Sequence, residues 1–200
     1  MIDEPRSLEN PEEITARHKM LEDDHIRPLT QFVEKIRKDK NLSNEVPFID
    51  PMGGGVNARC LCVLQDPGRK TQVTGLVSRN NPDPTARNIF TFYQEANIPR
   101  EETIIWNVVP WVVKNDKDFW RSFDQGVRYL KELISLLPEL KIIILHGNKA
   151  KYAKSTIEKE VPTLKFIDSW HTSNQSLNSR PKYREQIRAH LKEIYKLLYE

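Results

Sequence analysis

Four short apolar segments, each followed by a polar residue, constrain the fold of this chain more than any other feature. None of them alternates with polar residues, which is typical of strands that are covered on both faces. Each is too short for a helix of ordinary length and rich in β-branched or bulky side chains. The sequence therefore predicts buried strands at residues 60–64, 103–106, 142–145 and 164–167.

Helical patterns separate and follow these strands. Asp83 and Pro84 have the residue types of an N-cap and a first helical position, which predicts a helix that ends near Ala96. Apolar residues at helical spacing predict three more helices, at 123–137, 147–160 and 187–198. Strands that alternate with helices favour a parallel sheet. We expect an α/β fold, a three-layer α/β/α sandwich with a central four-stranded parallel sheet.

The N-terminal part has a different pattern. Residues 7–38 are charged and helical in spacing, and residues 41–56 are rich in proline, glycine and asparagine, which predicts a loop. We expect one domain over residues 1–200, with 1–45 as an N-terminal helical extension. The sequence leaves open whether this extension packs on the sheet, recruits a partner or forms a dimer contact.

Composition excludes several classes of protein. The 31 lysines and arginines against 28 acidic residues give a net charge of +3, too small to identify a nucleic-acid binder. No apolar run is long enough to span a membrane, and the acidic N-terminus is unlike a secretory signal. Cys60 and Cys62 cannot form a disulfide framework or a four-cysteine cluster. We expect a cytoplasmic protein.

Polar residues follow the predicted strands. They are Asp66, Asn107, His146 and His171, and ligands of open parallel sheets bind beyond the carboxyl ends of the strands. A carboxylate, an amide and two imidazoles could supply a base, a bidentate reader and a hydrogen-bond donor. Taken singly, each also has an ordinary structural interpretation as a turn, strand-end or loop residue.

Other residues favour packing or solvation over chemistry. Core or rim packing is typical of the aromatic residues, which are Trp106, Trp111, Phe119 and Trp120. A solvated face is typical of the basic residues unless they flank a groove, and these are Arg69, Lys70, Arg79 and Arg87. The sequence has no Gly-x-Gly-x-x-Gly, phosphate loop, His-Glu-x-x-His or Gly-x-Ser-x-Gly motif. It therefore predicts no dinucleotide site, no metal and no hydrolase nucleophile elbow.

Five segments in order resemble the motifs of one family. Leu-Gln-Asp-Pro-Gly is similar to the catalytic loop of the uracil-DNA glycosylase superfamily, and the other segments are similar to its helix start, base-reading strand, Leu-Trp-Gly segment and His-Pro-Ser-Pro loop. They lie at 64–68, 83–90, 105–110, 145–150 and 171–174. The resemblance implies the α/β/α fold of that family and a monofunctional DNA glycosylase of base-excision repair, which hydrolyses the N-glycosidic bond of a flipped-out uracil or relative.

The resemblance also implies roles for individual residues. Asp66 would orient or deprotonate the attacking water, and His171 would donate a hydrogen bond to O2 of the departing base. Asn107 would bind N3–H and O4 of the base, and Gln65 would contact the base edge through its backbone. No metal or cofactor takes part. DNA that contains uracil or a related base is the expected partner, with phosphate contacts from the polar residues Ser173, Gln175, Arg79 and Ser78.

Departures from the family pattern concern the substrate. Gly68 stands where the best-known branch has a tyrosine that blocks C5-substituted bases, so C5-modified uracils are expected to enter. No aromatic residue stands at the usual stacking position, which leaves Arg79, Phe90 or Trp111 as candidates. Both prolines of the His-Pro-Ser-Pro loop are replaced, and the chain lacks the cysteines of the iron–sulfur branches.

Two alternatives belong to other functional classes. The chain could bind nucleic acid or a modified base without cleaving it, which the missing stacking aromatic favours and the acidic Asp66 disfavours. It could also be a small-molecule hydrolase on a generic α/β sandwich, which predicts no dependence on DNA.

Overall fold

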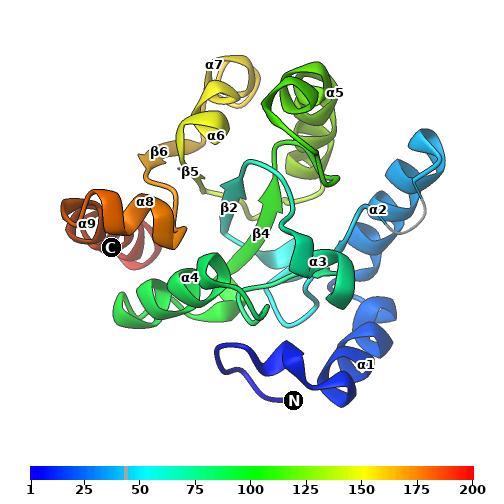
Figure 1. Cartoon of the computed structure of the whole chain (residues 1–200). Helices are drawn as coiled ribbons and strands as arrows, with labels where there is room; N and C mark the ends of the chain where they lie inside the picture. The colour runs from blue at the N-terminus through cyan, green and yellow to red at the C-terminus, as the bar shows by residue number, and fades with distance from the viewer. Residues whose placement is uncertain (43–44) are drawn as a thin grey trace.

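The computed structural model describes residues 1–42 and 45–200 and is built around one parallel sheet (Figure 1). Its strand order is β4-β2-β5-β6, and all three pairs are parallel. The strands are β2 (Cys60–Leu64), β4 (Thr103–Asn107), β5 (Ile142–His146) and β6 (Lys165–Ser169). The four predicted strands and their parallel arrangement are confirmed, with boundaries within two residues.

Helices cover both faces of this sheet, so the predicted three-layer fold is confirmed. On one face Leu61, Val63 and their neighbours pack against α2 (Arg27–Lys40), α5 (Asp116–Ser135) and the region of α6 (Asn148–Tyr152) and α7 (Lys154–Ile157). On the other face Cys60 and Cys62 pack against α4 (Pro84–Glu95) and α9 (Lys182–Tyr199), which Figure 1 places on the opposite side of the strands. Because successive strand residues point to opposite faces, an uninterrupted apolar run serves two cores.

The helices that follow the strands begin near the carboxyl edge of the sheet. Asp83 caps α4, because its carboxylate accepts the Ala86 N–H at 3.0 Å. In place of the single helix expected at 147–160, the structure has two shorter helices. The last helix begins at Lys182, earlier than expected, and the short helix at 174–179 was not expected. The bounds are α4 (Pro84–Glu95), α5 (Asp116–Ser135), α6 (Asn148–Tyr152), α7 (Lys154–Ile157), α8 (Asn174–Ser179) and α9 (Lys182–Tyr199).

The N-terminal part is not the single helix expected over 7–38. Asp23 has extended backbone with φ −65° and ψ 145°, which ends the first helical stretch before the second begins. Leu29, Val33 and Ile36 of the second helix are fully buried in the core. The elements are η1 (Ser7–Glu9), α1 (Pro11–Lys19), η2 (Met20–Glu22) and α2 (Arg27–Lys40).

The loop expected over 41–56 is partly a strand. β1 (Phe48–Ile49) pairs in parallel with β3 (Leu76–Val77) in a second, two-stranded sheet. Two-residue strands carry no readable periodicity, so the sequence did not indicate them. Residues 43–44 of the expected loop lie outside the described residues. The remaining short helices are η3 (Gly55–Asn57), α3 (Arg69–Thr74) and η4 (Arg100–Glu102).

Two searches over the described residues gave negative results. None of the helices in 1–42 and 45–200 is long and apolar enough to cross a membrane. In the same ranges, no three histidine, cysteine, aspartate or glutamate side chains gather closely enough to hold a metal ion.

Candidate active site

A cavity of about 190 Å³ opens beyond the carboxyl ends of β2 and β4. These strands are neighbours, and Leu64 at the end of β2 pairs in register with Asn107 at the end of β4. The segments that follow adjacent parallel strands therefore meet at this edge. The five residues expected to act on the base line the cavity together: Gln65, Asp66, Gly68, Asn107 and His171.

Asp66 is a partly buried carboxylate in this cavity. Its Oδ1 is shielded from solvent and has no hydrogen-bond partner among the described residues. Burial raises the pKa of Asp66 to about 6, an effect that the Lys149 charge, the Gln65 side chain and the Val113 backbone N–H partly offset. At neutral pH the group is an ionised carboxylate with an oxygen free to bind, as a base that acts on water requires.

Asn107 presents an unpaired donor to the same cavity. The residue is 1% exposed, and its Nδ2 has no acceptor within the described part of the chain. A buried amide N–H without a partner costs free energy, so such groups are rare and require an explanation. A ligand carbonyl in the cavity would satisfy this donor.

His171 is held as a neutral donor. Its Nδ1 accepts the Ser173 backbone N–H at 3.1 Å, and because that group can only donate, the ring proton of neutral His171 lies on Nε2. Burial, with help from the Lys149 charge, lowers the pKa of His171, which favours the neutral ring. Gly147 has φ +92°, and a Cβ there would lie 3.0 Å from the His171 Cβ, so the close approach of the two segments requires glycine.

His146 does not belong to the cavity, unlike the other three residues at the strand ends. It is fully buried, and its Nδ1 lies 3.0 Å from the Trp170 carbonyl oxygen. Burial lowers the pKa of His146 to about 4, so the ring is neutral and donates to that carbonyl. This hydrogen bond fixes the backbone directly before His171.

Gly68 leaves one wall of the cavity open. A Cβ built at this position meets no atom within 4 Å. The residue is exposed and has extended backbone with φ −72°, so no conformational requirement demands glycine here. The space beside Gly68 is therefore available to a ligand.

The residues expected to contact DNA lie in different surroundings. Ser173 caps α8 by accepting the Ser176 N–H at 3.3 Å, and Gln175 is exposed on the first turn of that helix. Arg79 instead pairs with Asp3, its side chain 11% exposed, and Ser78 is buried and donates to Asp50. These placements do not favour phosphate contacts for Arg79 or Ser78.

The apolar walls of the cavity were not identified from the sequence. They include the aliphatic residues Val77, Ile89 and Ile105. The aromatic residues expected as stacking candidates lie elsewhere. The Phe90 ring lies 4.9 Å from the Arg79 guanidinium, and Trp111 packs on Tyr129. Val77 lies on β3, which is too short to be recognised. Further polar residues of the lining are Thr71, Asn81 and Thr85, which the sequence did not single out, and Asp83, which it indicated only as a helix cap.

Lys149 is a further charged group near the cavity. Its Nζ is 2.6 Å from an Asp116 carboxylate oxygen and 4.7 Å from the centre of the Phe119 ring, and its side chain is 20% exposed. Its charge acts on both Asp66 and His171, lowering the pKa of each. The residue lies in the segment 145–150, but nothing in the sequence distinguished it from other surface lysines.

Comparisons with known proteins agree with this geometry. A family model described as "Uracil DNA glycosylase superfamily" matches residues 51–192, whereas no curated protein matches. Among solved structures, SMUG2 from Pedobacter heparinus is similar with a TM-score of 0.56 at 10% identity, covering 90% of this chain and 86% of that one.

Two further similar structures are forms of one protein, UNG from Nitratifractor salsuginis. The wild type has a TM-score of 0.48 at 12% identity, covering 92% of this chain and 98% of that one. A tyrosine-to-glycine mutant has a TM-score of 0.50 at 13% identity, covering 91% and 98%. At such low identities, structural likeness establishes the fold alone.

Proposed function

This chain belongs to the uracil DNA glycosylase superfamily, and from that premise we propose that it is a monofunctional DNA glycosylase of base-excision repair. Its substrate is uracil, or a C5-modified uracil, flipped out of DNA. One observation carries the proposal. Asp66, Asn107 and His171 line one small cavity, in which an oxygen of the first and the amide nitrogen of the second are buried without a hydrogen-bond partner among the described residues.

Asn107 selects the base. Its Nδ2 donates to O4 of uracil and its Oδ1 accepts N3–H, which satisfies the unpaired buried amide. Cytosine has an amino group and an unprotonated N3 at these positions, so both hydrogen bonds would be lost. Sites built around buried hydrogen bonds discriminate strongly against ligands that cannot make them.

Asp66 and His171 act on the two products of bond cleavage. The bond from sugar C1′ to base N1 breaks, and its electron pair leaves with the base while C1′ becomes positively charged. The Asp66 carboxylate stabilises that charge and accepts a proton from the water that attacks C1′. The Nε2–H of neutral His171 donates to O2 of the departing anion.

The open wall at Gly68 determines which bases fit. No atom of the described residues lies within 4 Å of a Cβ built there, so a substituent at C5 has room if this edge of the base faces Gly68. Ser173 and Gln175 border the segment that carries His171, and we assign them to contacts with the DNA backbone.

Base release from oligonucleotides tests this function. Single- and double-stranded oligonucleotides with one uracil are incubated with the protein, treated with alkali to cut abasic sites and compared with cytosine-containing controls. We expect scission at uracil only, and its loss in Asp66→Asn, Asn107→Ala and His171→Ala. Gln94→Ala, on α4 and outside the cavity lining, is a matched control that keeps activity.

The same assay separates the alternatives. Binding to uracil-containing DNA without scission would replace the glycosylase proposal with a non-catalytic base-binding protein. Absence of both binding and scission for uracil and its C5-substituted forms would contradict any role on DNA pyrimidines and leave the small-molecule hydrolase.

A further inference from the structure

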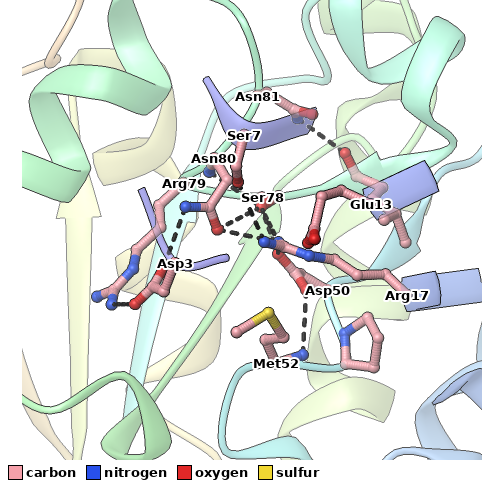
Figure 2. A network of polar contacts seen from close by, with 12 residues as sticks. Asp3, Ser7, Glu13, Arg17, Asp50, Met52, Ser78, Arg79, Asn80 and Asn81 are labelled. Atoms are coloured by element: carbon pink, nitrogen blue, oxygen red, sulfur yellow. Dashed lines mark hydrogen bonds and ion pairs between the residues drawn. The ribbon is translucent and has the colours of Figure 1, made fainter. Parts of the chain in front are cut away.

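A network of buried polar side chains joins the N-terminal segment to the wall of the cavity (Figure 2). We call it the N-terminal clamp and define it as Asp3, Arg17, Asp50, Ser78, Asn80 and Arg100. Of these residues, Arg17 and Asn80 are both fully buried. The family match begins at residue 51, so Asp3, Arg17 and Asp50 precede the part that this chain shares with the family.

Arg17 is the centre of the clamp. Its Nη1 donates to Asp50 Oδ2 at 2.6 Å and to Asn80 Oδ1 at 2.9 Å, and its Nη2 donates to the Ile2 carbonyl at 2.9 Å. Figure 2 shows the guanidinium directed from α1 towards Asp50, Ser78 and Asn80. One side chain thus connects three separate parts of the chain.

Asn80 is held a second time by the first residues of the chain. Its Nδ2 donates to Asp3 Oδ1 at 3.0 Å and to the Glu4 carbonyl at 2.7 Å, and its backbone carbonyl accepts the Leu8 N–H at 3.3 Å. Arg100 completes the arrangement by pairing with both Asp3 and Asp50. The side chain and backbone of Asn80 are therefore fixed largely by residues 1–17.

The segment that the clamp holds is a wall of the cavity. Val77, Ser78 and Asn81 line the cavity together with the strand-end residues, while Ser78 and Asn80 belong to the clamp and bond to its other members. A second, much smaller cavity of about 20 Å³ lies behind this wall, and Asp50 and Arg100 line it. Val77 and Ser78 thus border the candidate site on one side and the small cavity beside Asp50 and Arg100 on the other.

We propose that the N-terminal segment supports the candidate active site from outside the cavity, with Arg17 as a positioning residue that holds the 77–81 wall in the conformation that binds a flipped-out base. This inference rests on the glycosylase function proposed above. A site that must hold a small planar base needs walls whose side chains are fixed in advance. Neither Arg17 nor Asp3 lines the cavity, so Arg17 acts through Ser78 and Asn80, and Asp3 acts through Arg79 and Asn80.

The substitution Arg17→Met tests the clamp. Methionine fills part of the volume of the buried side chain, and Asp50 keeps Arg100 and Ser78 as partners, which limits the damage to the fold. Arg6→Met is the matched control, because Arg6 lies on the same segment and, within residues 1–42 and 45–200, its side chain pairs with Glu9 alone, at the surface. Asp3→Asn is a milder second variant at a partly exposed position, in case Arg17→Met does not fold.

Three measurements separate positioning from general damage. Hydrogen exchange of a peptide covering residues 76–86 reports on the wall. Inhibition by free uracil reports on base binding, and affinity for DNA with a reduced abasic site reports on backbone binding without a base.

For Arg17→Met we expect the exchange rate of this peptide and the inhibition constant of uracil to rise about tenfold. The affinity for abasic-site DNA should stay within twofold of wild type. Arg17→Lys should fall in between, and Arg6→Met should match wild type.

Several results would overturn the inference. Unchanged exchange and uracil inhibition in both Arg17→Met and Asp3→Asn would do so, as would equal losses of base and abasic-site binding. Failure of the glycosylase function itself is recognised separately, because the wild type would then release no base, while the exchange measurement would still report whether the clamp holds the wall.

Discussion

Two aspartates, the buried Asp50 and the partly buried Asp66, lie on opposite sides of the wall formed by Val77 and Ser78, and they differ in their partners. Asp50 is 5% exposed and accepts from Arg17, Arg100 and Ser78. Asp66 lines the cavity with one oxygen unpaired, and burial raises its pKa to about 6. A carboxylate whose bonds are filled by the protein stabilises a conformation, whereas one left without partners is available to a ligand.

The largest expected effects come from removing the charge of each carboxylate in turn. Asp66→Asn should reduce the single-turnover rate of uracil release by roughly 10²–10⁴-fold, the usual contribution of a general base, and leave the chain folded. Asp50→Asn should instead cost about 3–5 kcal/mol of unfolding free energy, because the buried Arg17 guanidinium loses its ion-pair partner and Arg100 loses one of its two. Rapid-quench kinetics and urea unfolding measure these effects, and equal loss of stability in both variants would contradict the comparison.

The pH dependence of the rate gives the next effect. If ionised Asp66 is required and its pKa is about 6, the single-turnover rate should rise tenfold per pH unit below that value and become constant above it. Between pH 4 and the plateau the change is about a hundredfold. A profile that is flat from pH 4 to 8 would exclude Asp66 as the essential base.

A bulky residue at Gly68 should change substrate choice. In Gly68→Tyr the ring would occupy the open wall and exclude bases substituted at C5, while plain uracil still fits. Steric pockets of this kind discriminate by about 10–200-fold. Competition between 5-methyluracil and uracil oligonucleotides measures the ratio for wild type and variant. An unchanged ratio would mean that C5 does not face Gly68.

The smallest effect concerns stability. Because the pKa of folded Asp66 lies above its value in the unfolded chain, the ionised carboxylate destabilises the fold at high pH, and this cost disappears below about pH 4. Asp66→Asn should therefore be about 1–2 kcal/mol more stable than wild type at pH 8 and no more stable near pH 4. Urea unfolding at both pH values tests the sign.

The sequence predicted the parts of the molecule that repeat a strong local pattern. The apolar runs gave the strands of the main sheet, and because these strands are parallel, Asp66, Asn107 and His171 could be expected at one edge. The position of His146 inside the core could not be read in this way, since the last residue of a strand faces either the cavity or a core according to its register.

The parts that could not be predicted depend on tertiary contacts. Strands β1 and β3 have two residues each, and the break at Asp23 splits a segment with helical spacing. Arg79 looks like a surface cation in the sequence, yet its partner Asp3 is 76 residues away. Most pairs in the clamp around Arg17 are likewise far apart in the sequence, so no local pattern indicates it.

A crystal structure of Asp66→Asn bound to a single-stranded oligonucleotide that contains uracil tests the central claim most directly. It should show the uracil in the cavity, with Asn107 Nδ2 within hydrogen-bond distance of O4 and His171 Nε2 within hydrogen-bond distance of O2. Bound DNA with the uracil outside the cavity, or with Asn107 Nδ2 still unpaired, would contradict the account.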